Sequence, residues 1–361
     1  MSKEGQITIQ FNWIFLLIVG GIILFFFIGL VSVQKKSSEG AVSAELLSQL
    51  STYFTGAGVS IGTVTVYDVP RMHLEFTCDE FVVNDKARRA FSNKVLFTPD
   101  EIDDHKMITW TLDWSVPFRV MNLLYITSPQ IRYIVFYDPL LGSHENAFFK
   151  DFNRSFPPEL NYQAYPVMGN DVSDFAFLSD YGNEKIQFIN MDSHMHNYLV
   201  YQISQEYFNM DNSDMSLVEI EPVGNFMDSG AKVKFHSLNS TDWHQDSALL
   251  DQGAGPQIVD YVNSFDDVSL YGAIISRDLE KFYCTLEKMY SNLNRMSSIL
   301  MMRSQNISNS YYNQCRQVHK KAADALMSLS GVSNPATIKT TAGLLDEYNK
   351  EARRYSCAPI Y

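Results

Sequence analysis

The chain has 361 residues and a formal net charge of −13 at pH 7, and 46% of its residues are hydrophobic and 19% are charged. This composition, without a Pro/Gly/Ser-rich tract or an internal repeat, is typical of a globular protein and argues against extensive disorder or a repeat architecture. The length beyond the first forty residues leaves room for one large or two ordinary domains.

An apolar run without a charged residue extends from Asn12 to Val33. As a helix rising ~1.5 Å per residue it would span roughly 33 Å, enough to cross a hydrocarbon core of ~30 Å. A secretory signal peptide would have a shorter apolar stretch that ends in a small-x-small cleavage site. We therefore predict an amino-terminal segment, residues 1–36, that contains one transmembrane helix at about residues 12–33, and the lipid bilayer is the first expected partner. Positive charge is nearly equal on the two sides of the run, so the charge rule does not assign the orientation.

The residues before this run, Gly5-Gln6-Ile7-Thr8-Ile9-Gln10, resemble the amino terminus of archaeal type IV pilin-like precursors, which carry a class III signal peptide. The resemblance covers residues 5–34. In that family a dedicated peptidase cuts between a Gly and the following Gln, so the resemblance implies processing between Gly5 and Gln6. It also implies other membrane or filament subunits as partners.

Two positions depart from the family pattern. Gln10 stands where the family has a Glu that is thought to pair with a neighbouring subunit's amino group, and a neutral amide offers only a hydrogen bond there. Glu4 stands where the family prefers Lys or Arg. The rest of the chain resembles archaeal single-span membrane proteins of unknown function.

Residues 37–58 follow the run and are predicted to form a helical stalk. Leu46, Leu47, Leu50 and Tyr53 recur on one helical face, which we expect to dock on the next domain.

Residues 59–275 are predicted to form an α/β ectodomain, so the expected fold class is mixed α/β (α+β). Its start, residues 59–115, alternates and is rich in β-branched and aromatic residues, which predicts a β-rich subdomain. Strand patterns follow at 132–138, 174–180, 185–192, 216–222 and 231–237, and helix patterns at 143–156, 196–208 and 246–265. This alternation predicts an α/β layer with some parallel pairing.

Residues 276–361 have helical spacing and are predicted to form a C-terminal helical hairpin, with a break at 330–335 and an antiparallel partner at about 336–355. Residues 277–361 hold twelve Lys/Arg against seven Asp/Glu, whereas residues 37–276 hold thirteen against thirty-three. We expect the basic helices to dock on the acidic body or to present a solvated face. Because the body would repel a polyanion, nucleic acid is not an expected partner.

The four cysteines lie far apart and form no Cys-x-x-Cys motif. A turn near Pro335 would place Cys315 and Cys357 at similar distances along opposing helices, which favours their pairing and leaves Cys78 with Cys284. Three pairings are possible, and oxidation requires an extracellular location. In the cytosol, all four would be small buried hydrophobes.

Three strand patterns end in an aspartate: Asp138, Asp180 and Asp192. The carboxyl ends of parallel strands are where α/β folds place ligands and metals, although Asp also caps turns and helices.

The stretch around Asp192 also contains His194 and His196, and these three residues are candidates for metal ligands. A His-x-His pair on an extended segment points both imidazoles to one face, but only a distant residue such as His236 or His244 could complete the site. No motif for a phosphate loop, dinucleotide fold, nucleophile elbow or zinc protease occurs, so we expect no cofactor.

These observations favour a single-span membrane protein with an extracellular, non-enzymatic ectodomain for binding or assembly, such as a minor pilin-like subunit. Two alternatives remain open. The first is a membrane-tethered, metal-dependent hydrolase that uses the strand-end aspartates, and the second is a cytosol-facing membrane scaffold.

Overall fold

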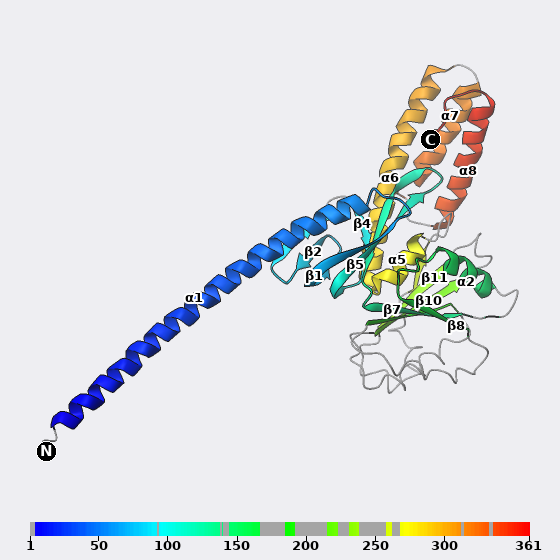
Figure 1. The fold of residues 1–361 in the computed structure, drawn as a ribbon. Coiled ribbons are helices and arrows are strands. Elements are labelled where there is room, and N and C mark those ends of the chain that lie inside the picture. Colours follow the sequence, from blue (N-terminus) through cyan, green and yellow to red (C-terminus); the bar gives the residue numbers. More distant parts are fainter. Residues whose placement is uncertain are drawn as a thin grey trace.

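The fold is a mixed α/β arrangement of two six-stranded sheets, an amino-terminal apolar helix and C-terminal helices, as the sequence predicts (Figure 1). The structure is a computed structural model. It describes residues 4–91, 94–137, 139, 144–166, 185–191, 215–222, 231–237, 258–261, 268–311, 314–331 and 335–361.

Helix α1, Glu4–Ala57, is one continuous helix of 54 residues that contains both the predicted membrane span and the predicted stalk. The segment Phe15–Ser32 has a mean hydropathy of 2.8 and none of it is buried, so it is long and apolar enough to cross a membrane. It projects far from the rest of the molecule (Figure 1). No proline interrupts α1, and the expected boundary at residues 36/37 is therefore not a structural break.

The last turns of α1 pack on the first sheet, which confirms the expected docking of the stalk. Leu46, Leu50 and Phe54 are buried together with residues of strands β1, β2 and β5. Phe54 meets Phe81 with a ring-centroid distance of 5.2 Å. Because this apolar face is covered, the folded body is attached directly to the helix that carries the apolar segment.

Sheet A has the strand order β3-β2-β1-β5-β6-β4 and is antiparallel except for the β4–β6 pair. Its strands are β1 (Val64–Phe76), β2 (Glu80–Val83), β3 (Ala87–Ala90), β4 (Val95–Phe97), β5 (Glu101–Ser115) and β6 (Arg119–Thr127). The β-rich region therefore continues past the predicted limit at residue 115, because β6 completes the sheet. Strand β1 runs through Pro70, and its pairing with β5 shifts in register between Asp68 and Met72.

Sheet B has the strand order β12-β11-β10-β9-β7-β8. Its strands are β7 (Ile131–Tyr137), β8 (Tyr162–Pro166), β9 (Lys185–Asn190), β10 (Met215–Pro222), β11 (Ala231–Ser237) and β12 (Ile258–Tyr261), and α2 (His144–Ser155) follows β7. The four strands β8, β7, β9 and β10 are parallel, which confirms the expected parallel pairing.

One predicted helix of the ectodomain is in part a strand, and two other predicted elements lie outside the described residues. The second half of the predicted 246–265 helix contains strand β12, where Ile258 and Val259 pair with β11. β-branched residues suit a pleated sheet better than a helix. The patterns at 174–180 and 196–208 lie outside the described residues.

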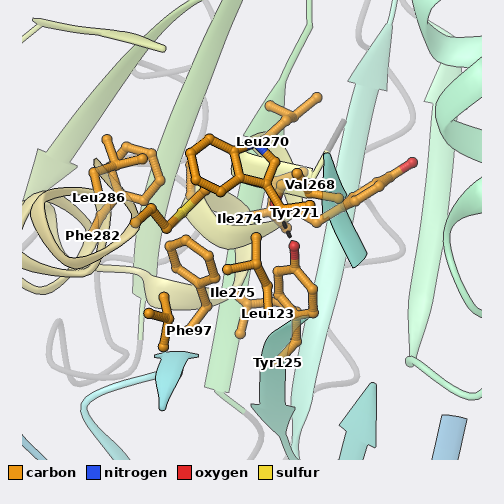
Figure 2. Close-up of a cluster of buried hydrophobic side chains, with 14 of the residues drawn as sticks. Phe97, Leu123, Tyr125, Val268, Leu270, Tyr271, Ile274, Ile275, Phe282 and Leu286 are labelled. Carbon is orange, nitrogen blue, oxygen red and sulfur yellow. Dashed lines mark hydrogen bonds between the residues drawn. The ribbon is translucent and has the colours of Figure 1, made fainter. Parts of the chain in front are cut away.

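Helix α5, Val268–Ser276, lies in the core that sheets A and B share, and all nine of its residues are buried. Figure 2 shows its apolar side chains against Phe97, Leu123 and Tyr125 of sheet A and against Phe282 and Leu286. The hydroxyl of Tyr125 donates a hydrogen bond of 2.6 Å to the Val268 carbonyl. This helix was not predicted, because its run of nine residues is short and contains only two polar side chains, Ser269 and Ser276, to mark a helical period.

The C-terminal region has three helices rather than the predicted hairpin: α6 (Leu279–Ser310), α7 (Gln314–Leu329) and α8 (Pro335–Arg354). The second turn lies where Pro335 predicts it. The first turn was missed because α6 ends at Tyr311 without a Gly or Pro signal. Ser308 then donates from its hydroxyl to the Arg316 carbonyl across this turn at 3.1 Å.

The packing of α5 makes Gly272 a sensitive position. A Cβ atom at residue 272 would lie 2.5 Å from Cε1 of Phe97, so we expect Gly272→Ala to lower the free energy of unfolding by about 1–3 kcal/mol. Gly343→Ala is the matched control, because Gly343 is exposed in the middle of α8 and a Cβ there meets open space. This control should stabilise the protein by about 0.5–1 kcal/mol. Denaturant unfolding of both variants measures the two effects, and an unchanged midpoint for Gly272→Ala would contradict the described packing.

Candidate functional site

The sequence-predicted metal ligands Asp192, His194 and His196 lie outside the described residues, as do Asp138, Asp180 and His244. His236 lies on β11. Gly5 and Gln6, the predicted processing residues, belong to the first turn of α1.

The strand order of sheet B bears on whether the strand-end aspartates could belong to a ligand site. After β7 the chain passes through α2 to β8 on one side, and β9 pairs with β7 on the other side. Such a reversal of strand order is where open α/β sheets hold ligands, at the carboxyl ends of the strands. Asp138 and Asp192 follow β7 and β9 by one and two residues in the sequence.

The four cysteines form two disulfides in the structure, Cys78–Cys284 and Cys315–Cys357, with Cα–Cα distances of 6.2 Å and 5.5 Å. These pairings fit the expectation from the sequence. The first bridge joins the β1–β2 turn to α6, where the Lys288 ammonium also lies 2.8 Å from Oδ1 of Asp79. The second joins the start of α7 to the chain that follows α8.

A cluster of charged side chains lies where sheet A meets the amino end of β9. We call it the seam cluster: His73, Asp85, Glu101, Asp103 and Lys185. His73 on β1 and Asp103 on β5 are cross-strand partners, so their side chains lie on the same face of the sheet. Lys185 reaches this face from β9.

The local fold holds His73 in place. Asn84 and Asp85 form the turn between β2 and β3 with φ values of 51° and 57°, a conformation that Asn and Asp tolerate well. The side-chain oxygen of Asn84 accepts a hydrogen bond of 3.0 Å from the backbone N–H of His73. The turn that carries Asp85 is therefore fixed to the strand that carries His73.

Short contacts connect the seam cluster. Nδ1 of His73 lies 2.6 Å from Oδ1 of Asp103, and Nε2 lies 3.9 Å from Oδ1 of Asp85. Burial lowers the pKa of His73, but the hydrogen bond to Asp103 and the charges of Asp103, Asp85 and Glu101 outweigh it, so the pKa is raised above 6.5. The imidazole is therefore held toward its charged form.

The ammonium of Lys185 lies 2.6 Å from Oε1 of Glu101. Only 8% of the Lys185 side chain is exposed, against 45% for Glu101. A nearly buried cation needs its partner, because an unpaired buried charge is costly. This ion pair therefore joins sheet A to sheet B.

Three of these residues could also coordinate a metal ion. Ligand atoms of His73, Glu101 and Asp103 all lie within 4.8 Å of one another, and one nitrogen with two carboxylate oxygens suits Zn²⁺ or Mn²⁺. Each carboxylate, however, already has a cationic partner, Lys185 on Glu101 and His73 on Asp103. A metal would have to displace the nearly buried ammonium of Lys185. The geometry therefore fits an ion-pair network between the sheets better than a metal centre.

Sequence analysis missed the seam cluster. Its signal is the alternation of polar residues at 73 and 75 and at 101 and 103. That signal becomes informative only when β1 is known to pair with β5, across two intervening hairpin strands and β4 in the chain.

No protein-family model, curated protein or solved structure matches the chain.

The raised pKa of His73 makes stability depend on pH. A histidine with a raised pKa in the folded state contributes stability that is fully present below pH 6.5 and is lost as the pH rises through the folded pKa. We expect Asp103→Asn to lower the free energy of unfolding most below pH 6.5, where His73 is charged. The difference in this free energy between the variant and the parent protein should shrink toward about pH 8. Unfolding midpoints between about pH 5 and pH 8 measure this difference.

The difference between the parent protein and Asp103→Asn is independent of His319, a buried histidine on α7 that also makes stability depend on pH. Burial lowers the pKa of His319, but the residue is common to both proteins and its titration cancels. A difference that grows with pH would contradict the charged state of His73.

Proposed function

We propose that the chain is a single-span membrane-anchored surface protein whose ectodomain serves in binding or assembly rather than catalysis. The observation that carries the proposal is α1. Its apolar segment, Phe15–Ser32, is fully outside the folded body, whereas Leu46, Leu50 and Phe54 of the same helix are buried against sheet A. A helix with these two parts suits a protein that holds its folded body at a membrane surface.

Two disulfides support an extracellular ectodomain. Cystines form and persist in oxidising compartments and are rare in the cytosol. No free cysteine is left among the four, all of which lie in described segments. A cytosol-facing scaffold would have to keep both pairs reduced, so it fits this arrangement less well.

The pilin-like amino terminus makes the proposal more specific. The residues Gly5-Gln6 lie a few residues before the apolar run, as in the family that they resemble, and processing there would leave Gln6 as the first residue of α1. A minor pilin-like subunit would accommodate an ectodomain of this size. Gln10 would offer a neighbouring subunit a hydrogen bond in place of a charge pair.

The second candidate function is a membrane-tethered, metal-dependent hydrolase, and the strand order of sheet B favours it. Adjacent parallel strands β7 and β9 precede Asp138 and Asp192 in the sequence, and two carboxylates at such an edge suit a hard cation. If this function is right, the purified chain should retain a divalent metal that is lost in Asp138→Asn and Asp192→Asn but kept in the seam variant Asp103→Asn. Elemental analysis of the parent chain and the three variants decides this point.

Intact mass under non-reducing conditions, with and without thiol alkylation, tests the proposed function. For protein taken from its native membranes we expect the loss of residues 1–5 and no alkylation. Reduction should then allow alkylation at all four cysteines. A Gly5→Val variant is the matched control, because it should keep residues 1–5 and still form both disulfides. A full-length parent chain with four reactive thiols would overturn both the processing and the extracellular location.

A further inference from the structure

A hollow of about 500 Å³ lies where the carboxyl end of α1 meets β4 and β6. Ten residues line it: Thr55, Gly58, Val59, Lys94, Val95, Arg119, Val120, Met121, Asn122 and Leu124. Two of them are cations, none is acidic, and five are apolar. This composition is unusual in a chain whose net charge is −13.

Both cations of the hollow are held by neutral partners. Nζ of Lys94 donates a hydrogen bond of 2.6 Å to Oγ1 of Thr55, and Nη2 of Arg119 donates one of 2.7 Å to Oδ1 of Asn122. Asn122 is itself fixed, because its side-chain N–H donates to the Gly58 carbonyl at 2.7 Å. Within the described part of the chain, neither cation has a carboxylate at ion-pair distance. The two positive charges are therefore held in position by neutral groups, without a negative charge to neutralise them.

The fold explains one of these cations but not the other. The last carbonyls of a helix favour a nearby cation, and the Lys94 side chain, which comes from the segment before β4, reaches Thr55 in the last turn of α1. Even so, partial burial and the charge of Arg89 lower the pKa of Lys94, which means that its surroundings disfavour the positive charge. Arg119 comes from the exposed start of β6, and no helix end accounts for it.

The apolar part of the lining adds a second requirement for any ligand. Val59 is exposed beside the hollow, and Leu124 belongs to the apolar cluster under α1, whereas Val95 and Val120 point their side chains into the core around α5. Inorganic anions gain nothing from such surfaces, but an alkyl group gains free energy when they cover it.

We propose that this hollow binds a carboxylate that carries a short apolar group. The carboxylate would lie between the Lys94 ammonium and the Arg119 guanidinium, with its apolar group against the exposed side chain of Val59. Such a group occurs in a free short-chain carboxylic acid and in a peptide segment where an acidic side chain stands beside an aliphatic one.

The inference deepens the proposed function, because it gives the binding ectodomain a class of ligand, and it rests on the ectodomain being a binding module. Its test does not depend on processing of the amino terminus or on membrane orientation. A failed titration and a failed mass measurement therefore remain distinguishable.

Isothermal titration calorimetry of the full chain in lipid nanodiscs tests the proposal, with empty nanodiscs as the blank. The probes are acetate, hexanoate, hexylamine and inorganic phosphate. We expect saturable binding of hexanoate, with affinity rising from acetate by about fourfold for each methylene that becomes buried. Hexylamine should not bind, because it has the same alkyl chain but the wrong charge.

Variants locate the site. Arg119→Gln and Lys94→Gln should each weaken hexanoate binding by about tenfold or more. Lys106→Gln is the matched control, since it removes the same charge from an exposed position of β5 outside the hollow. Arg119 is exposed, so its replacement should leave the unfolding midpoint unchanged.

Four results would overturn the proposal. Hexanoate could fail to bind in the millimolar range, phosphate could bind as tightly as hexanoate, hexylamine could bind equally well, or Lys106→Gln could weaken binding as much as Arg119→Gln. If free hexanoate binds and a short acidic-aliphatic peptide binds more tightly, the natural source of the carboxylate is a protein segment. If the peptide binds less tightly, the source is a free acid.

Discussion

The burial of α5 against both sheets is the packing constraint on which the rest of the fold depends. All nine of its residues are buried, and a helix can be enclosed in this way because it satisfies its own backbone polar groups. Phe97 lies against Gly272, and the Tyr125 hydroxyl bonds to the Val268 carbonyl. The chain then enters α6, whose Phe282 and Leu286 belong to the same core. Sheet A, sheet B and the helical region therefore share one apolar cluster that α5 completes.

Sheet A is covered on both faces, so α1 and sheet B can both pack against it. Along β6, Leu123 and Tyr125 belong to the core around α5, whereas Leu124 and Ile126 belong to the cluster under α1. The side chains alternate between two apolar surroundings instead of between core and solvent. The two polar features at the margins of this sheet have different characters. In the seam cluster every carboxylate has a nearby cation or a histidine, whereas the hollow at the end of α1 has cations without a carboxylate.

Sequence patterns predicted the elements whose residues carry their own periodicity. The apolar run of α1, the docking face through Leu46 and Leu50, and most strands of sheet B were predicted for this reason. Elements whose structure depends on contacts with distant parts of the chain were not predicted. Helix α5 has no polar face to reveal its period, and the turn at Tyr311 has no glycine or proline. The seam cluster depends on the pairing of His73 with Asp103, residues that are thirty positions apart. No local pattern contains that pairing, because it is set by the order of strands in the sheet.

The continuity of α1 has a mechanical consequence. Ten helical residues separate Ser32, at the end of the apolar segment, from Ser43, which is buried where α1 meets sheet A. Each residue in a helix adds ~1.5 Å of height and about 100° of rotation. In the proposed membrane-anchored arrangement, the length of this linker sets both the height of the folded body above the bilayer and the direction in which it faces around the helix axis. Neighbouring copies whose apolar segments contact through the same face would hold their folded bodies at a fixed rotation about the helix axis. Loss of a single linker residue would change that rotation by more than a quarter turn while leaving the folded body unaltered.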